Sequence, residues 1–186
     1  MSINNNSAMS TASDSERLQS LARQLAGKYM TFKLASEEYG LAILRVREII
    51  GLMDITRVPR TKDFIRGVIN LRGKVIPVVD LRLVFNMDRT ENTDQTVIIV
   101  VQWTVGNTST TMGILVDEVL EVMSIDAEQI EPPPDLRSSN GDNDFILGIG
   151  KAEKRVICLL DIERVLSKDE ANHLASVVPE DANTAI

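Results

Sequence analysis

The segment FIRGVINLRGKVIPVVDLRLVF, residues 64–85, lies without a gap over the later segment FILGIGKAEKRVICLLDIERVL, residues 145–166. The two segments share several apolar residues, one glycine and one aspartate. The glycine match is Gly67 with Gly148, and the aspartate match is Asp80 with Asp161. Apolar matches arise easily between β proteins, whereas an aligned glycine and an aligned aspartate do not. The overlay therefore indicates an internal repeat.

A second ungapped overlay extends the repeat towards the N-terminus. Residues 40–50 lie over residues 113–123, and they share a glycine, a valine (Val46 and Val119) and a glutamate (Glu48 and Glu121). Both halves then have the same order: a hairpin, this crossing segment, a polar connection, a second hairpin and a short helix. Repeats over about residues 29–88 and 96–166, each with about five short strands, predict a mainly β fold of two SH3-like five-stranded barrels with a few short helices.

The ends of the chain differ in composition from the repeats. Residues 1–14 are rich in Ser and Asn, which predicts a disordered tail. Apolar residues recur at helical spacing in residues 15–27, which predicts a short helix that stops near Gly27. We expect the folded domain to cover residues 28–168 and residues 169–186 to form a C-terminal tail, with a last helical turn or two before a frayed end.

The overall composition bounds the partners. The formal net charge is -7 and the sequence pI about 4.8, so we expect no nucleic-acid partner, because phosphate backbones are bound by clustered Lys and Arg. The longest apolar run, residues 97–101, is too short to span a bilayer, so we expect no membrane insertion. The single cysteine, Cys158, can form no internal disulfide, which is typical of a reducing, cytoplasmic compartment.

Few residues carry a pattern typical of catalysis. Asp80 and Asp161 each end a predicted strand before a short apolar helix, where an aspartate can accept hydrogen bonds from free helical N–H groups. The alternative is a small metal-dependent enzyme that uses Asp80, Asp117 and Asp161. The sequence contains no GxxxxGK[ST] phosphate loop, and His173 has no Cys or His neighbour. We therefore expect no catalytic residue, metal site or cofactor.

Two stretches of the first repeat mix apolar residues with charges of both signs. They are residues 44–50 and the predicted turn at residues 70–73. One interpretation is a solvated strand edge with a loose ion pair, which would contribute little. The other is a binding patch in which Val46 supplies area, while Glu48 and Arg72 fix orientation. Composition alone leaves both interpretations open.

The first-half motif over residues 64–82, with residues 38–43 and 46–49, closely resembles the signature of the CheW family. Residues 113–119 and 145–150 fall where that family has similar stretches, and the resemblance covers about residues 28–168. It implies two intertwined SH3-like barrels packed around a shared hydrophobic core. It also implies a non-catalytic adaptor without a cofactor, which couples chemoreceptors to the histidine kinase CheA in signalling arrays.

The resemblance further implies partners, a location and site residues. The partners would be the SH3-like regulatory domain of CheA and the cytoplasmic tip of methyl-accepting chemoreceptors, and the protein would be cytoplasmic and recruited to membrane-associated receptor arrays. The family positions linked to coupling fall on six residues of matching type: Val46, Glu48, Gly67, Arg72, Val119 and Val122. A coupling module of a pilus or second-messenger pathway remains an alternative. The chain departs from the family pattern in its longer N-terminal extension and in a lengthened loop expected over residues 105–110.

Overall fold

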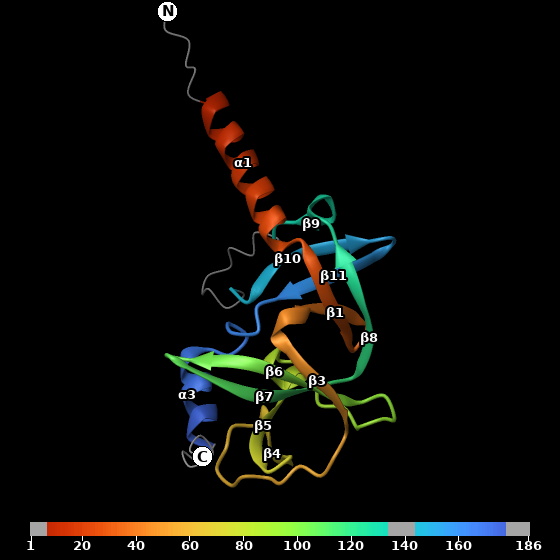
Figure 1. Ribbon diagram of the computed structural model, residues 1–186, viewed down its shortest axis with the longest axis vertical. Helices are drawn as coiled ribbons and strands as arrows, with labels where there is room; N and C mark the ends of the chain where they lie inside the picture. The colour runs from red at the N-terminus through yellow and green to blue at the C-terminus, as the bar shows by residue number, and fades with distance from the viewer. Residues whose placement is uncertain (1–6, 134–143, 178–186) are drawn as a thin grey trace, which may run out of the picture.

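The computed structural model describes residues 7–133 and 144–177, which form eleven strands, three α-helices and two short 3-10 helices (Figure 1). The first repeat holds β1 (Gly27–Leu34), β2 (Glu37–Ala42), η1 (Ile43–Arg45), β3 (Val46–Gly51), β4 (Ile65–Leu71), β5 (Lys74–Asp80) and α2 (Leu81–Val84). The second holds β6 (Val97–Val105), β7 (Thr108–Val116), β8 (Glu118–Ile125), η2 (Ala127–Gln129), β9 (Ile130–Glu131), β10 (Ile146–Ala152) and β11 (Arg155–Leu160). Helices α1 (Ser7–Leu25) and α3 (Lys168–Val177) flank the repeats.

The strands form two sheets, and each sheet builds one SH3-like barrel. The first barrel has five strands in the order β3-β6-β7-β5-β4, and the second has six in the order β8-β1-β2-β11-β10-β9. The sixth strand, β9, is only two residues long. The predicted fold class, mainly β with two SH3-like barrels, is confirmed.

The barrels do not coincide with the repeats, because the repeats exchange their first hairpins. The β1–β2 hairpin of the first repeat pairs with β8 and, in parallel, with β11 of the second repeat. The β6–β7 hairpin of the second repeat pairs with β3 and, in parallel, with β5 of the first. Gly40 lies opposite Leu159 and Gly113 opposite Val78, which are equivalent positions in the sequence overlay. The exchange therefore follows the same pseudo-symmetry as the repeat.

A hydrophobic core shared by both barrels fills the space between them, as the family resemblance implied. It combines Phe32 and Leu41 of the second barrel with Val101 and Ile114 of the first, and all four side chains are fully buried. Burying one such side chain stabilises the fold by about 1.5–3 kcal/mol. A row of aromatic rings crosses this core, with centroids 5.0–5.8 Å apart along Phe32, Tyr39, Phe85 and Phe145. Each barrel also has a smaller core of its own.

The N-terminal helix α1 is longer than the sequence predicted. We expected a helix over 15–27 after a disordered 1–14, but α1 begins at Ser7 and ends at Leu25, and residues 1–6 lie outside the described range. The helix also ends earlier than expected, because β1 already begins at Gly27. Only the end of α1 contacts the second barrel, where Leu25 packs and its carbonyl accepts a 2.5 Å hydrogen bond from the Tyr29 hydroxyl. Its earlier turns project away from the barrels (Figure 1).

The helix expected after Lys168 is longer than a turn or two and is docked on the barrels, since α3 runs for ten residues. Ser167 and Glu170 cap α3 reciprocally: the Glu170 N–H donates to Ser167 Oγ at 3.2 Å and the Ser167 N–H to Glu170 Oε2 at 2.8 Å. Leu174 is fully buried in the shared core, and His173 Nε2 accepts a 3.3 Å hydrogen bond from the Lys62 N–H. Residues 178–186 lie outside the described range.

Residues 105–110, which we expected to form a lengthened loop, lie mostly in paired strands. Strands β6 and β7 continue to pair as far as Val105 and Thr108, so these residues extend the hairpin. The turn contains Gly106 at φ 59°, a left-handed conformation that glycine adopts without steric cost. Residues 105–110 therefore belong to the β6–β7 hairpin, apart from the turn at Gly106 and Asn107.

The first barrel closes along a seam between its two edge strands, β3 and β4. The segment that follows β3 pairs with β4 at one isolated β-bridge. In this bridge Thr56 and Val68 exchange two backbone hydrogen bonds of 2.9 Å. Gly67 precedes this bridge at φ 141°, and a Cβ atom there would lie 2.1 Å from the Thr56 carbonyl oxygen. Glycine at position 67 is therefore required for the seam to close.

We expect Gly67→Ala to lower the free energy of unfolding by roughly 3 kcal/mol, because it adds both a steric overlap and an unfavourable φ. Gly51→Ala is the matched control, since a Cβ at that exposed position meets nothing within 4 Å. The control should change stability by less than about 0.5 kcal/mol. Urea unfolding of both variants checks this, and equal midpoints would contradict the role given to Gly67.

Candidate functional site at the seam of the first barrel

The end of the seam opposite the Thr56 bridge is closed by an ion pair between Glu48 and Arg72. Glu48 lies on β3, whose pairing with β6 has a β-bulge between Val46 and Glu48. Arg72 lies in the two-residue turn between β4 and β5, where Arg72 and Gly73 have φ values of 52° and 84°. Two consecutive positive φ values match the twist of a tight hairpin, and they place the Arg72 side chain at the tip of the turn.

The contact between Glu48 and Arg72 is bidentate. Nη1 of Arg72 donates to Oε1 of Glu48 at 2.9 Å, and Nη2 donates to Oε2 at 2.6 Å. These hydrogen bonds and the charge of Glu48 raise the pKa of the Arg72 guanidinium further above its ordinary value. The Arg72 side chain is still 74% exposed and that of Glu48 28%. An ion pair this exposed contributes little to stability, so its main physical effect is to fix the orientation of both side chains.

The six residues predicted to bind partners fall into two groups. Glu48, Arg72 and Gly67 lie along the seam, but Gly67 is buried beneath Thr56 and offers no side chain to a partner. Two of the three valines, Val46 and Val119, pack half-buried against the shared core, whereas Val122 on β8 of the second barrel is 49% exposed.

The second barrel has a counterpart of the Glu48–Arg72 pair that the sequence analysis missed. Arg155 Nη2 lies 2.8 Å from Glu38 Oε2, and its Nη1 lies 2.5 Å from Glu121 Oε1. Glu121 is equivalent to Glu48 in the overlay, so the repeat itself was a usable signal. The arginine differs in origin, because Arg155 is equivalent to Lys74 and not to Arg72.

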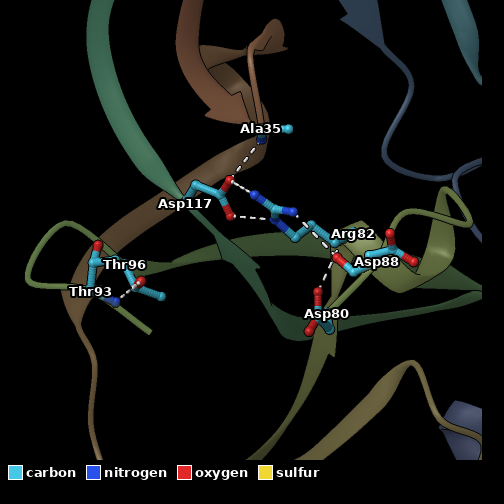
Figure 2. A network of polar contacts seen from close by, with 7 residues as sticks. All are labelled: Ala35, Asp80, Arg82, Asp88, Thr93, Thr96 and Asp117. Carbon is cyan, nitrogen blue, oxygen red and sulfur yellow. Dashed lines mark hydrogen bonds and ion pairs between the residues drawn. The ribbon is translucent and has the colours of Figure 1, made fainter. Parts of the chain in front are cut away.

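An ion pair also holds the crossover from β7 to β8, where the chain passes between barrels (Figure 2). Arg82 of α2 donates to Asp117 through Nε at 2.8 Å and through Nη2. The Ala35 N–H, from the β1–β2 turn of the second barrel, donates to Asp117 Oδ2 at 2.7 Å. Burial would raise the pKa of Asp117, but the hydrogen bonds from Arg82 and Ala35 and the charge of Arg82 outweigh it and lower that pKa below its ordinary value.

The other crossover, from β2 through η1 to β3, carries a similar pair of reversed polarity. Arg45 of η1 donates to Glu163 at 2.8 Å, and Glu163 is equivalent to Arg82 in the overlay. This pair is more open, with side-chain exposures of 44% and 33% against 16% and 24% for Arg82 and Asp117. The pair between Arg82 and Asp117 is therefore the more strongly coupled of the two.

The three aspartates of the metal-enzyme alternative are engaged in the fold. Oδ1 of Asp80 accepts from the Arg82 N–H at 3.1 Å at the start of α2, which confirms the predicted cap there. Asp161 accepts from the Glu163 N–H at 3.0 Å, but it caps no helix. The residues after Asp161 form a turn instead of the expected short helix. Within residues 7–133 and 144–177, no three His, Cys, Asp or Glu side chains group in a way that could hold a metal ion.

Comparison with known proteins agrees with this geometry. The CheW-like domain model matches residues 28–170. Chemotaxis protein CheW of Klebsiella aerogenes is 39% identical over 151 residues, 81% of this chain and 88% of that protein. The Bacillus subtilis CheW is 34% identical over 155 residues, 83% of this chain and 94% of that protein.

A solved structure shares the two-barrel fold. The crystal structure of scaffolding protein TtCheW from Thermoanaerobacter tengcongensis superposes with a TM-score of 0.69 at 35% identity, covering 78% of this chain and 96% of that one. The fold thus defines a two-barrel scaffold of the chemotaxis class. The chain belongs to the CheW family, as its sequence indicated. Proteins of this family couple chemoreceptors to the kinase CheA.

None of the helices in the described ranges is both long and apolar enough to cross a membrane.

We expect Asp117→Asn to lower the free energy of unfolding at neutral pH by about 2 kcal/mol, because a partly buried Arg82 loses its charged partner. The pKa of Asp117 is lower in the folded state than its ordinary value of 3.8, so this contribution is present above that pH and is lost as the pH falls below it. The difference between wild type and variant should shrink accordingly in urea unfolding at acidic pH.

Glu163→Gln is the comparison for that variant, because it removes one charge from the more open crossover pair. It should cost less than about 1 kcal/mol at neutral pH. An equal cost for both variants, or a difference that is independent of pH, would contradict the assignment.

Proposed function

We propose that this protein is a non-catalytic chemotaxis adaptor that couples chemoreceptors to the histidine kinase CheA in a signalling array. The observation that carries the proposal is the family match, which runs through both barrels and includes all six candidate residues. The relatives named above are chemotaxis proteins, which favours this function over a module for a pilus or second-messenger pathway. The protein would act in the cytoplasm and be recruited to membrane-associated receptors.

The proposed absence of catalysis is supported by the state of the reactive groups. Asp80 and Asp117 already bind backbone N–H groups and arginines, so neither carboxylate is available as a base or metal ligand. Burial and the nearby charge of Glu37 raise the pKa of the Cys158 thiol. A protonated, half-buried thiol is a poor nucleophile.

We place the receptor contact at the junction of the barrels. Val46 and Val119 border the shared core from equivalent strands, and Val122 adds exposed apolar area on β8. An apolar strip of this kind fits the apolar face of a helix, which is the chemistry expected of a receptor's helical hairpin tip.

We place the kinase contact on the outer face of the first barrel, at the Glu48–Arg72 pair. The two side chains hold each other in one geometry, so a partner meets a preorganised charged surface at low entropic cost. The partner would be the SH3-like regulatory domain of the kinase. Signal transfer would then be a coupling free energy of about 1–3 kcal/mol between receptor state and kinase state.

We expect Arg72→Ala to reduce receptor-dependent kinase activation roughly tenfold in reconstituted receptor–adaptor–kinase assemblies, while the protein stays folded. The exposed guanidinium contributes little to the fold, so the thermal midpoint should not change. Lys151→Ala is the matched control, because it breaks an exposed ion pair with Glu131 in the second barrel. Its activation should equal that of the wild type.

An Arg72→Ala protein that is unfolded or aggregated would show that Arg72 stabilises the fold, and it would contradict the proposed role in kinase coupling. Failure of the wild-type protein to bind any CheA-type kinase or receptor fragment would reject the adaptor function itself.

A further inference from the structure

A cavity of about 490 Å³ opens at the end of the first barrel beside the Glu48–Arg72 pair. Its lining comes from all five strands of the barrel or the turns between them. Two lining residues, Ile76 and Val100, belong to the barrel's own core and are 4% and 1% exposed, so they form an apolar floor. We call this cavity the barrel mouth. Its rim carries the charged side chains.

The rim has more positive than negative charge. Arg47, Arg72 and Lys74 face a single carboxylate, Glu48, whose two oxygens are both bound by Arg72. Arg47 donates to the neutral amide oxygen of Gln102, and Lys74 makes no ion pair or side-chain hydrogen bond within the described residues. Among the described residues, Arg47 and Lys74 therefore have no carboxylate partner, in a chain whose formal net charge is -7.

This excess is particular to the first barrel. In the second barrel the equivalent of Arg47 is Leu120, and the equivalent of Lys74 is Arg155. Arg155 is matched by two carboxylates, those of Glu38 and Glu121. The repeat therefore does not explain the unmatched cations at the mouth of the first barrel.

We propose that the barrel mouth receives an acidic side chain of the partner kinase, bound between Arg47 and Lys74. This rests on the proposed function and names the chemistry of its kinase contact. A charged rim is a poor surface for the apolar face of a receptor helix, whereas two unmatched cations are complementary to a carboxylate. Arg72, held by Glu48, borders the same opening and stays in place.

The recognition is electrostatic and solvent-exposed, so it has a characteristic salt dependence. Charges at the rim of an interface act mainly on the association rate and on specificity. Added salt screens them, because the Debye length falls to about 8 Å near physiological ionic strength. Loss of both cations should therefore matter most at low ionic strength.

The test measures the affinity of the full chain for an isolated CheA-type kinase and, separately, for a receptor tip fragment, at low and high salt. The variant is Arg47→Gln with Lys74→Gln. The matched control is Arg57→Gln with Lys62→Gln, which removes one arginine and one lysine from exposed positions of the 52–64 connection in the same barrel. Thermal unfolding verifies that both proteins are folded, and Arg47→Lys tests whether charge alone suffices.

We expect the mouth variant to bind the kinase roughly tenfold more weakly at low salt, with a smaller loss at high salt. The control should lose less than about twofold and receptor binding should not change. Arg47→Lys should retain kinase affinity, because the rim acts through its charge. An equal loss in variant and control, no loss, or a loss confined to the receptor would each overturn the inference. Absence of kinase binding by the wild type would reject the proposed function, and this inference with it.

Discussion

Two parallel strand pairings, β2 with β11 and β5 with β7, are the interactions on which the rest of the molecule depends. Each joins a hairpin of one repeat to a strand of the other, so neither repeat holds a complete barrel by itself. Separating the repeats would leave buried N–H and C=O groups unpaired in both sheets, which is costly. The two barrels therefore form one folding unit.

The shared core and the two crossovers follow from this exchange. The first hairpin of each repeat packs in the barrel that the other repeat completes. Side chains from both barrels therefore converge on the same apolar cluster. The chain must pass between the barrels after β2 and again after β7, and an ion pair lies at each passage: Arg45 with Glu163 and Arg82 with Asp117. Links of this kind oppose sliding of one barrel against the other, which suits an adaptor that holds two partners in a fixed geometry.

The surface of the first barrel is arranged around its seam. One end of the seam is closed by backbone pairing at Thr56, which needs glycine at position 67. The other end is closed by exposed charges, Glu48 and Arg72, which add little stability but stay oriented. The backbone-paired end therefore stabilises the fold, whereas the charged end is where we place the proposed kinase contact.

The amino-acid sequence by itself determined the repeat, the positions of the hairpins and the capping role of Asp80, because these depend on local periodicity and turn chemistry. It also indicated Glu48 and Arg72 as a possible pair, although composition could not decide between a loose edge and a binding patch. Only the tertiary structure decided which hairpins the intertwined barrels exchange, that Gly67 is a seam residue, and that Arg82 reaches Asp117. Hydrogen-bond partners of a strand edge lie far away along the chain, and the same alternating pattern satisfies more than one pairing, so pairing is settled only when side chains pack into a common core.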